Sequence, residues 1–411
     1  MTASASASPR NARARLGFGL FDGDNHYYEP RDAFTRYIEP RFRDQAVHTR
    51  RGPDGRETIW IGAKPFTFLA DMELNFDTTL RPGSLREFLR TLTHEQPADA
   101  DPVQIAVDPA FVDRAARLRL MDEQGVESVF LFPTLGVCVE HFMKDDVPQT
   151  YANLRAFNRW LDEAWGFAWQ ERIYASPVLS LLDPAEAEKD LEWMLGRGAR
   201  AINVRVGPAG GRSPADPVFH RVWSRANEAG ITVVYHVGES GYNELMSVHW
   251  GEAPNPSSHS QSAFQWTNFY GDRPIMDTIS ALILHNFFGR YPNVKVLSVE
   301  NGSLWVPYLM KVMDKMKGMG RHGPWLGGRV HGRPSDIFKQ HVWVNPYHEE
   351  DHVFLADLIG VDHVVYGSDF PHPECVPHPD EWLADIQGKF SPGDLKKVMR
   401  DNARALVGLP A

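Results

Sequence analysis

Short apolar runs rich in β-branched and aromatic residues recur along most of the chain, and stretches with helical spacing separate them. Several of these runs end abruptly at a glycine, a proline or a polar side chain, as buried strands of a parallel sheet do. The pattern predicts eight strands, at residues 17–21, 128–132, 173–181, 201–206, 231–235, 294–299, 341–344 and 364–366. Helical spacing predicts helices at residues 111–123, 151–165, 184–195, 217–228, 275–288, 303–316, 353–358 and 392–407.

The alternation of strands and helices indicates the fold class. Strands that alternate with helices form right-handed βαβ units in one parallel sheet. Eight such strands predict an α/β fold built as a closed (β/α)8 TIM barrel, in which the polar strand ends all meet at one face. The alternative is a doubly wound open sheet, which would normally carry a glycine-rich phosphate loop after its first strand. Neither GxGxxG nor GxxxxGK[ST] follows the first predicted strand, so the barrel is favoured.

Three segments depart from this regular alternation. Residues 1–15 are rich in Ser, Ala and Arg and predict a disordered tail, which leaves 16–411 as a single barrel domain. From about residue 30 to about 110 the alternation is lost, and a hairpin is expected around residues 51–61. This long insertion after the first strand forms either a cap or an oligomer surface. Residues 237–273 are polar and rich in Gly, Ser and Pro, so we expect an extended loop at the C-terminal face of the barrel.

The charge and the cysteine content exclude several functions. A formal net charge of −10, from 43 basic and 53 acidic residues, argues against binding to nucleic acid or to an anionic membrane. The chain contains no run of about 18 apolar residues, so nothing is expected to span a membrane. Cys138 and Cys375 match no zinc-binding spacing, and two cysteines in 411 residues favour reduced thiols and a cytoplasmic location.

Polar side chains that suit a metal ion follow three of the predicted strands. Asp24 and His26 follow the first strand, His236 the fifth and Asp369 the eighth. A single histidine or acid at a strand end is more often structural, but in a barrel these four converge on one mouth. Neutral imidazoles together with ionised carboxylates bind one divalent first-row metal and leave a position open. Zinc is the metal we expect first, with manganese and iron as alternatives. The sequence leaves open whether Asp24 or Asp22 is the first ligand.

Five motifs give the chain a resemblance to a known family. They are Asp24-Asn25-His26 with Glu29-Pro30, residues 121–126 (MDEQGV), 235–238 (YHVG), 287–296 (FFGRYPNVKV) and 366–372 (YGSDFPH). In their order and spacing they resemble the amidohydrolase-related (amidohydrolase 2) group of metal-dependent barrel enzymes, which includes aminocarboxymuconate semialdehyde decarboxylase. The resemblance covers nearly the whole chain from Asp22 onward.

The resemblance implies roles for the residues that match the motifs of the family. The metal-binding pair of the family falls on Asp24 and His26 of this chain. The strand-five histidine of the family corresponds to His236, and its strand-eight aspartate corresponds to Asp369. Residues 202–205 (INVR) lack the lysine that bridges two metals in binuclear relatives, so one metal ion is expected.

Glu300 and Asp369 are the candidate catalytic residues. The related decarboxylases carry a catalytic histidine after strand six, and this chain has Glu300 there. A carboxylate with an ordinary pKa is a poor acid at neutral pH but a serviceable base toward water. We therefore expect a metal-dependent hydrolase that acts on a small organic acid or a cyclic substrate through metal-activated water. A decarboxylase of an aromatic or enoic acid is the first alternative, and a metal-free binding or scaffold barrel is the second.

Four further residues are candidates for substrate binding. Arg205 alternates with apolar neighbours at the end of the fourth strand, where it holds a substrate carboxylate or forms a structural ion pair. Trp250 and Trp266 belong to an aromatic group that forms either a lid over an aromatic substrate or a dimer contact. His372 follows Asp369 by three residues and contacts the substrate or supports the metal ligands. The expected partners are a small-molecule substrate and a second copy of the chain, most simply in a dimer.

Overall fold

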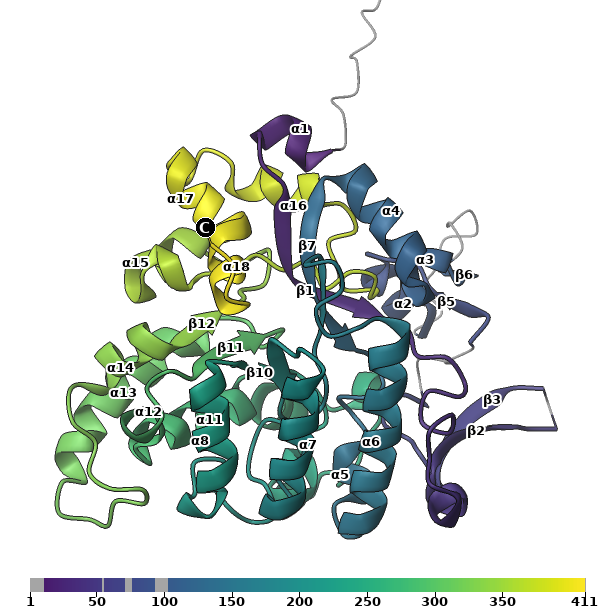
Figure 1. Ribbon diagram of the computed structural model, residues 1–411, viewed down its shortest axis with the longest axis horizontal. Coiled ribbons are helices and arrows are strands. Elements are labelled where there is room, and N and C mark those ends of the chain that lie inside the picture. The colour runs from purple at the N-terminus through teal and green to yellow at the C-terminus, as the bar shows by residue number, and fades with distance from the viewer. Residues whose placement is uncertain (1–10, 54, 71–75, 93–102, 411) are drawn as a thin grey trace, which may run out of the picture.

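A ring of parallel strands surrounded by helices forms the centre of the protein (Figure 1). The computed structural model describes residues 11–53, 55–70, 76–92 and 103–410. The ring strands are β1 (Leu20–Tyr27), β7 (Val126–Pro133), β8 (Ile173–Ala175), β9 (Ala201–Asn203), β10 (Thr232–His236), β11 (Lys295–Val299) and β12 (Val342–Val344). They pair in parallel in two groups, β1-β7-β8 and β9-β10-β11-β12. Each strand overlaps a predicted one, and β1 extends beyond its predicted end to include Asp24 and His26.

Short stretches of pairing join the two groups to each other and to the eighth predicted strand. Beyond the end of β8, Val178 forms a parallel bridge with Asn203 of β9. Residues 364–366, the predicted eighth strand, continue from β12 through a parallel bridge between Val344 and Val364. With these bridges, the described residues form a continuous series of eight paired strand segments.

The eighth segment also pairs with β1, which closes the ring. The amide of Gly23 donates a hydrogen bond to the carbonyl of Tyr366 over 2.8 Å, and Asn25 forms a parallel bridge with Phe370. Gly23 is required here, because a Cβ atom would lie 2.6 Å from the carbonyl oxygen of Tyr366. The pairing confirms the predicted (β/α)8 barrel and excludes the open sheet, since an open sheet leaves two edges unpaired.

Side chains of the strands alternate between the inside of the barrel and the surrounding helices. On β10, Val234 packs in a cluster with residues from the other strands, whereas Val233 and Tyr235 belong to the larger core beneath the helices. The inner cluster comprises Phe21, Phe130, Phe132, Tyr174, Ala201, Val234, Leu297, Val299 and Val365, with Ala403, Leu406 and Val407. Because successive side chains of a strand point in opposite directions, His236 lies on the same side as Val234 and faces the barrel interior.

Helices cover the outside of the ring, and α6, α7 and α8 lie side by side on one part of it (Figure 1). The longer helices are α4 (Arg114–Gln124), α6 (Val147–Ala164), α7 (Pro184–Gly196), α8 (His220–Ala229), α11 (Asp272–Leu284), α13 (Trp305–Met319), α14 (Pro334–His341), α15 (His352–Ile359) and α16 (Pro379–Ile386). Two of these, α14 and α16, were not predicted, because each is a short segment that starts at a proline within a stretch rich in turn residues. Among the described residues, no helix combines the length and apolar character needed to cross a membrane.

The predicted disordered tail needs correction where the structure describes it. Residues 1–10 lie outside the described residues, but Ala12–Leu16 form helix α1. The side-chain amide of Asn11 donates to the carbonyls of Asp122 and Glu123 over 3.0 Å each, and Ala12 is fully buried. The prediction failed because composition alone does not show that the last turn of α4 offers free carbonyl groups to a neighbouring segment.

The insertion after β1 folds over the loops at the C-terminal ends of the strands. Its predicted hairpin is confirmed by β2 (Val47–Arg51) and β3 (Glu57–Ile61), which pair antiparallel. The amide of Ser258, in the long loop after β10, donates to the carbonyl of Phe68 over 2.6 Å. The amide of Leu85 donates to the carbonyl of Pro373, which lies shortly after Asp369 in the chain. These contacts favour the cap over the oligomer surface as the role of the insertion.

The segment after β10 is largely helical in short pieces, although the sequence predicts a loop. Its pieces are α9 (Tyr242–Leu245), η4 (Ser247–Trp250), η5 (Ser258–Ser260), α10 (Ala263–Gln265) and η6 (Trp266–Tyr270). The pieces are too short to produce a hydrophobic period that a sequence pattern reveals. Side-chain bonds to the backbone hold the segment together, as in the capping box formed by Ser262 and Gln265 at the start of α10.

Candidate metal centre

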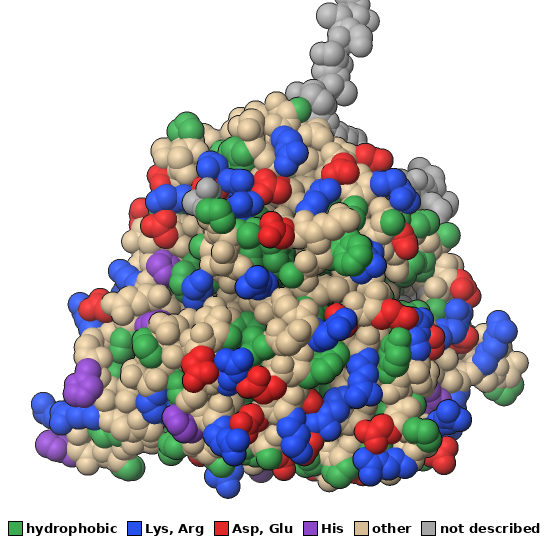
Figure 2. Space-filling view, viewed as in Figure 1, with side chains coloured by type: hydrophobic (Ala, Val, Ile, Leu, Met, Phe, Trp, Pro, Cys, Tyr) green, Lys and Arg blue, Asp and Glu red, His purple; other side chains and the backbone are tan. Residues whose placement is uncertain are grey.

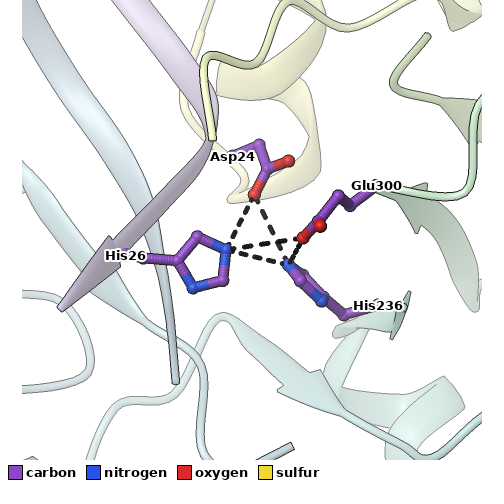
Figure 3. A group of neighbouring side chains, drawn as sticks. All are labelled: Asp24, His26, His236 and Glu300. Carbon is purple, nitrogen blue, oxygen red and sulfur yellow. Dashed lines mark hydrogen bonds and ion pairs between the residues drawn. The ribbon is translucent and has the colours of Figure 1, made fainter. Parts of the chain in front are cut away.

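Four side chains from three strand ends of the ring meet at the barrel mouth (Figure 3). Asp24 and His26 come from β1, His236 ends β10, and Glu300 directly follows β11. The Nε2 atoms of the two histidines lie 3.0 Å apart. Asp24 Oδ1 lies 3.3 Å from Nε2 of His26 and 3.5 Å from Nε2 of His236. Glu300 Oε2 approaches the same two nitrogens to 3.9 and 3.3 Å.

Asp369 and His372 adjoin this group on the other side of His26. Asp369 Oδ1 lies 3.4 Å from Nε2 of His26 and 2.7 Å from Nδ1 of His372. The ring of His372 lies against the ring of His26, with centroids 3.9 Å apart. Nε2 of His372 is 2.9 Å from the hydroxyl of Thr134. Both ring nitrogens of His372 therefore contact protein groups, which favours support of the metal ligands over substrate contact as its role.

Hydrogen bonding fixes which nitrogen of His236 can bind a ligand. Its Nδ1 atom lies 2.8 Å from the carbonyl oxygen of Val237, and a carbonyl can only accept a hydrogen bond. Nδ1 therefore carries the proton, and the lone pair of Nε2 points at Asp24 and His26. Metal-binding histidines are commonly held in this way, with one nitrogen bound to a backbone carbonyl.

Two buried carboxylate oxygens in this cluster have no hydrogen-bond partner. They are Oδ1 of Asp24 and Oδ2 of Asp369, and both residues are at least nine-tenths buried. Buried acceptors without a donor are costly, and a cation satisfies them. Two imidazole nitrogens and carboxylate oxygens suit a divalent first-row metal, so the residues present fit the predicted cofactor.

The acids of the cluster influence one another's ionisation. Burial opposes the charge on Asp24, but contacts from His236 and His26 outweigh it and hold the pKa of Asp24 well below its usual range. Burial raises the pKa of Glu300 well above its ordinary value, and the nearby charges of Asp369 and Asp24 raise it further. Burial likewise raises the pKa of Asp369, helped by the charge of Glu374. This accumulation of negative charge is the environment that a cation stabilises.

Two of these acids occupy a strained backbone conformation. Glu300 has φ of 54° and Asp369 has φ of 60°, in the left-handed region that side chains other than glycine rarely adopt. Val299 faces the barrel interior, so simple alternation would direct Glu300 away from the mouth. The left-handed turn after β11 reverses this direction and brings its carboxyl to His236. Strain of this kind typically occurs at functional sites.

A buried network beneath the mouth joins β1 to the eighth strand segment. The carboxylate of Asp22 accepts hydrogen bonds from the amide of Ser368 at 2.9 Å, from the Ser368 hydroxyl at 2.5 Å and from the side chain of Asn25 at 2.9 Å. Asp22 is thus committed to structure, and Asp24 is the residue that faces the metal-binding group. This arrangement answers the question that the sequence left open.

Arg117 of α4 extends the same network and was not predicted. Its guanidinium donates to Asn25 Oδ1, to the carbonyl of His26 at 2.7 Å and to the carbonyl of Ala110 at 2.7 Å. Only 1% of Arg117 is exposed. The sequence gives no indication of this role, because α4 is a polar helix and Arg117 lies about 90 positions from its partners on β1.

Arg205 is not brought to the metal-binding group. Its Nε atom lies 3.4 Å from Glu140 Oε1, and its two terminal nitrogens donate to the carbonyls of Ser240 and Pro208. Of the two roles that the sequence left open, the structural ion pair is the one that this geometry supports. We therefore do not retain Arg205 as the anchor of a substrate carboxylate.

The two tryptophans proposed for substrate binding lie at the periphery of the mouth. Trp250 is 70% exposed and packs edge-on against Phe264, and Trp266 is 41% exposed and packs against Tyr270. Neither has a ring contact with the metal-binding residues. Tyr270 lies deeper: burial raises its pKa well above the ordinary value, and the charges of Cys138 and Glu300 raise it further.

Comparison with known proteins agrees with this architecture. The chain belongs to the amidohydrolase family, whose model matches residues 70–409, which confirms the resemblance inferred from the motifs. It is similar to an amidohydrolase from Mycobacterium avium subsp. paratuberculosis K-10, with 36% identity and a TM-score of 0.83 over 96% of this chain and 100% of the other. No curated protein matches the chain.

More distant structures share the fold. A 5-carboxyvanillate decarboxylase from Novosphingobium aromaticivorans DSM 12444, complexed with manganese, is 14% identical with a TM-score of 0.59, over 99% of this chain and 100% of its own. A 2,6-dihydroxybenzoate decarboxylase from Rhizobium is 14% identical with a TM-score of 0.55, over 95% of this chain and 98% of its own. Membership of the amidohydrolase family makes this protein an enzyme.

Proposed function

We propose that the protein is a metal-dependent decarboxylase of a small aromatic or enoic acid. The observation that carries the proposal is the position of Glu300, whose carboxyl lies beside the metal-binding histidines yet keeps 15% of its side chain exposed in the mouth. A group so placed can reach both the metal site and a carbon atom of the substrate. The decarboxylases that share the fold support this choice over the hydrolase expected from the sequence.

The proposed cation is held by four residues. Asp24, His26 and His236 supply three ligands, and Asp369 completes the set because its buried Oδ2 has no other partner while His372 holds its Oδ1. A bound divalent cation would polarise an oxygen of the substrate and so favour electron withdrawal from the reacting bond. Manganese, present in three of the structures with this fold, is the first metal to test.

Glu300 would then supply the proton of the reaction. When the bond between the substrate carbon and its carboxylate breaks, carbon dioxide leaves and the electron pair stays on the substrate carbon. The proton of Glu300 forms the new C–H bond, and Glu300 takes up another proton from solvent. General acid catalysis of this kind contributes about 10²–10⁴-fold to a rate.

A panel of aromatic and enoic acids tests the proposal, with the manganese-loaded protein and release of carbon dioxide as the readout. In deuterium oxide, the product is expected to carry deuterium at the carbon that lost the carboxylate. The Glu300→Gln variant should keep its metal and lose about 100-fold or more in turnover. Lactones and amides, assayed for acid release, form the comparison set. Hydrolysis of these compounds without release of carbon dioxide from any acid would establish the hydrolase instead.

The same variant set tests the ligand assignment. Glu300 is the rival fourth ligand, because it groups with Asp24, His26 and His236 within 4.8 Å, whereas Asp369 groups with His26, Glu300 and His372. We expect Asp369→Asn to lose metal and Glu300→Gln to retain it. The reverse result would exchange the two roles and make Asp369 the proton carrier.

A further inference from the structure

A basic depression that is open to solvent, called the basic cavity below, lies on the helical side of the molecule, apart from the candidate metal centre. The second half of α13, the loop 320–333 and the start of α14 line it, and its volume is about 750 Å³. Figure 2 shows basic and histidine side chains gathered at the lower left of the molecule, over this loop. The charged residues of the lining are Lys311, Lys315, Lys317, Arg321, Arg329 and Arg333, with Asp314 as the acid.

Part of this charge is used by the fold itself. Asp314 accepts from Arg333 Nε at 2.7 Å and from the amide and hydroxyl of Ser335 at 2.9 and 2.8 Å. Lys317 donates to the carbonyl of Gly332. The acid and two of the six basic residues therefore form the walls of the cavity and attach the loop to α13 and α14.

The other four basic side chains have no such partner. Lys311, Lys315, Arg321 and Arg329 form no hydrogen bond or ion pair with any residue that the structure describes. Simple helix-end stabilisation does not account for all four, because Arg321 and Arg329 lie in the loop beyond α13, whose last residue is Met319. Four uncompensated positive charges thus surround one space in a chain whose formal net charge is −10.

The loop that carries two of these charges is held in place. The side-chain amide of Asn286 donates to the carbonyl of Gly327 over 3.1 Å, and Val330 is buried to 2% exposure. Gly327 has φ of 77°, and a Cβ atom there would lie 2.3 Å from the carbonyl oxygen of His285. Arg329 therefore lies between Gly327 and Val330, which are both held in place. Less conformational entropy is then lost when a ligand binds.

The cavity also offers room for a ligand. Two of its lining residues are glycines, Gly318 of α13 and Gly332 of the loop. A Cβ atom at either position would meet no heavy atom within 4 Å. The basic side chains consequently border open space and are not packed against one another.

We propose that this cavity binds a small molecule that carries at least two phosphate groups. Lysine and arginine bind phosphate through charge-assisted hydrogen bonds, and four free cations exceed what one phosphate neutralises. Since the lining contributes six positive and one negative charge to a net −10, the rest of the chain carries −15. That remainder repels an extended polyanion such as nucleic acid or an anionic membrane.

Calorimetric titration of the full-length protein with inorganic tripolyphosphate tests the site. We expect saturable binding at one site per chain that weakens as the salt concentration rises. Lys315→Glu and Arg329→Glu should each weaken binding about 10-fold or more, as expected when a charge-assisted contact becomes a repulsion. Gly318→Asp should weaken it as well, since it places an acid in the cavity and leaves every basic residue intact. Lys389→Glu, at an exposed lysine outside the cavity, is the matched control and should bind as the wild type does.

Several outcomes would overturn the proposal. Absence of tripolyphosphate binding at low salt would do so directly. Equal weakening in Lys389→Glu would show a response to total charge and no defined site. Tighter binding of an oligonucleotide or of anionic vesicles than of tripolyphosphate would show that the surface serves a macromolecule. Melting temperatures of all four variants, measured alongside, show whether each is folded. If a charge-reversal variant does not fold, Gly318→Asp still tests the site.

Discussion

Replacement of Arg117 by methionine should weaken the fold and the metal site together. The buried guanidinium donates to three acceptors, two of them on the part of β1 that carries the metal-binding residues. A buried acceptor left without its donor costs about 1–3 kcal/mol, so three such groups cost about 6 kcal/mol in total. Burial of the cation opposes this, because it lowers the pKa of Arg117 from its ordinary value to about 10. That shift corresponds to about 3 kcal/mol, and the expected net loss is about 3 kcal/mol.

Urea unfolding of the metal-free protein measures this loss without a contribution from metal binding. Metal affinity is measured separately, and we expect it to fall by about 10–100-fold, as for other residues that position metal ligands. Arg119→Met is the matched control, since Arg119 is exposed on the same helix and should change neither quantity. A stability within about 0.5 kcal/mol of the wild type would refute the energetic reasoning. A large loss of stability with unchanged metal affinity would refute the proposed link to the site.

Three further predictions concern the metal, the pH dependence and the N-terminal helix. The wild-type protein should take up about one equivalent of divalent metal, as measured by elemental analysis. At the same free metal concentration, His236→Ala should take up at least about 10-fold less. Absence of uptake by the wild type after reconstitution would refute the metal site. Burial raises the pKa of Glu29 to about 7, whereas in the unfolded chain Glu29 loses its proton near pH 4.5. The free energy of unfolding should therefore fall as the pH rises from about 4.5 to about 7. In denaturation curves, the Glu29→Gln variant should lack up to about 3 kcal/mol of this decrease in the free energy of unfolding. The same pH dependence in the wild type and the variant would contradict the prediction. Asn11→Ala should cost about 1–2 kcal/mol through its bonds to the end of α4, and an unchanged urea midpoint would show that α1 adds nothing to stability.

The sequence determined the strands and the main candidates for metal binding. A buried strand can be recognised from its own residues, since apolar residues must fill it and a polar residue or a breaker must end it. In a barrel all strands end at one face, so Asp24, His26 and His236 were predicted to meet from their positions alone. In the structure, Oδ1 of Asp24 and the Nε2 atoms of His26 and His236 lie within 3.5 Å of one another, as that reasoning requires.

Only the tertiary structure decided which bonds close the barrel and what surrounds the site. Periodicity shows that a segment is buried but does not identify its neighbour. The sequence therefore predicted closure from the number of strands, and the structure shows the bonds between β1 and the eighth segment that achieve it. The same limit applies to Arg205, whose partner Glu140 lies 65 positions away. The direction of Glu300 depends on a left-handed backbone turn, which the surrounding packing imposes on a residue that does not favour it. Ion pairs, buried networks and strained turns arise from contacts between distant segments, and the fold must exist before they do.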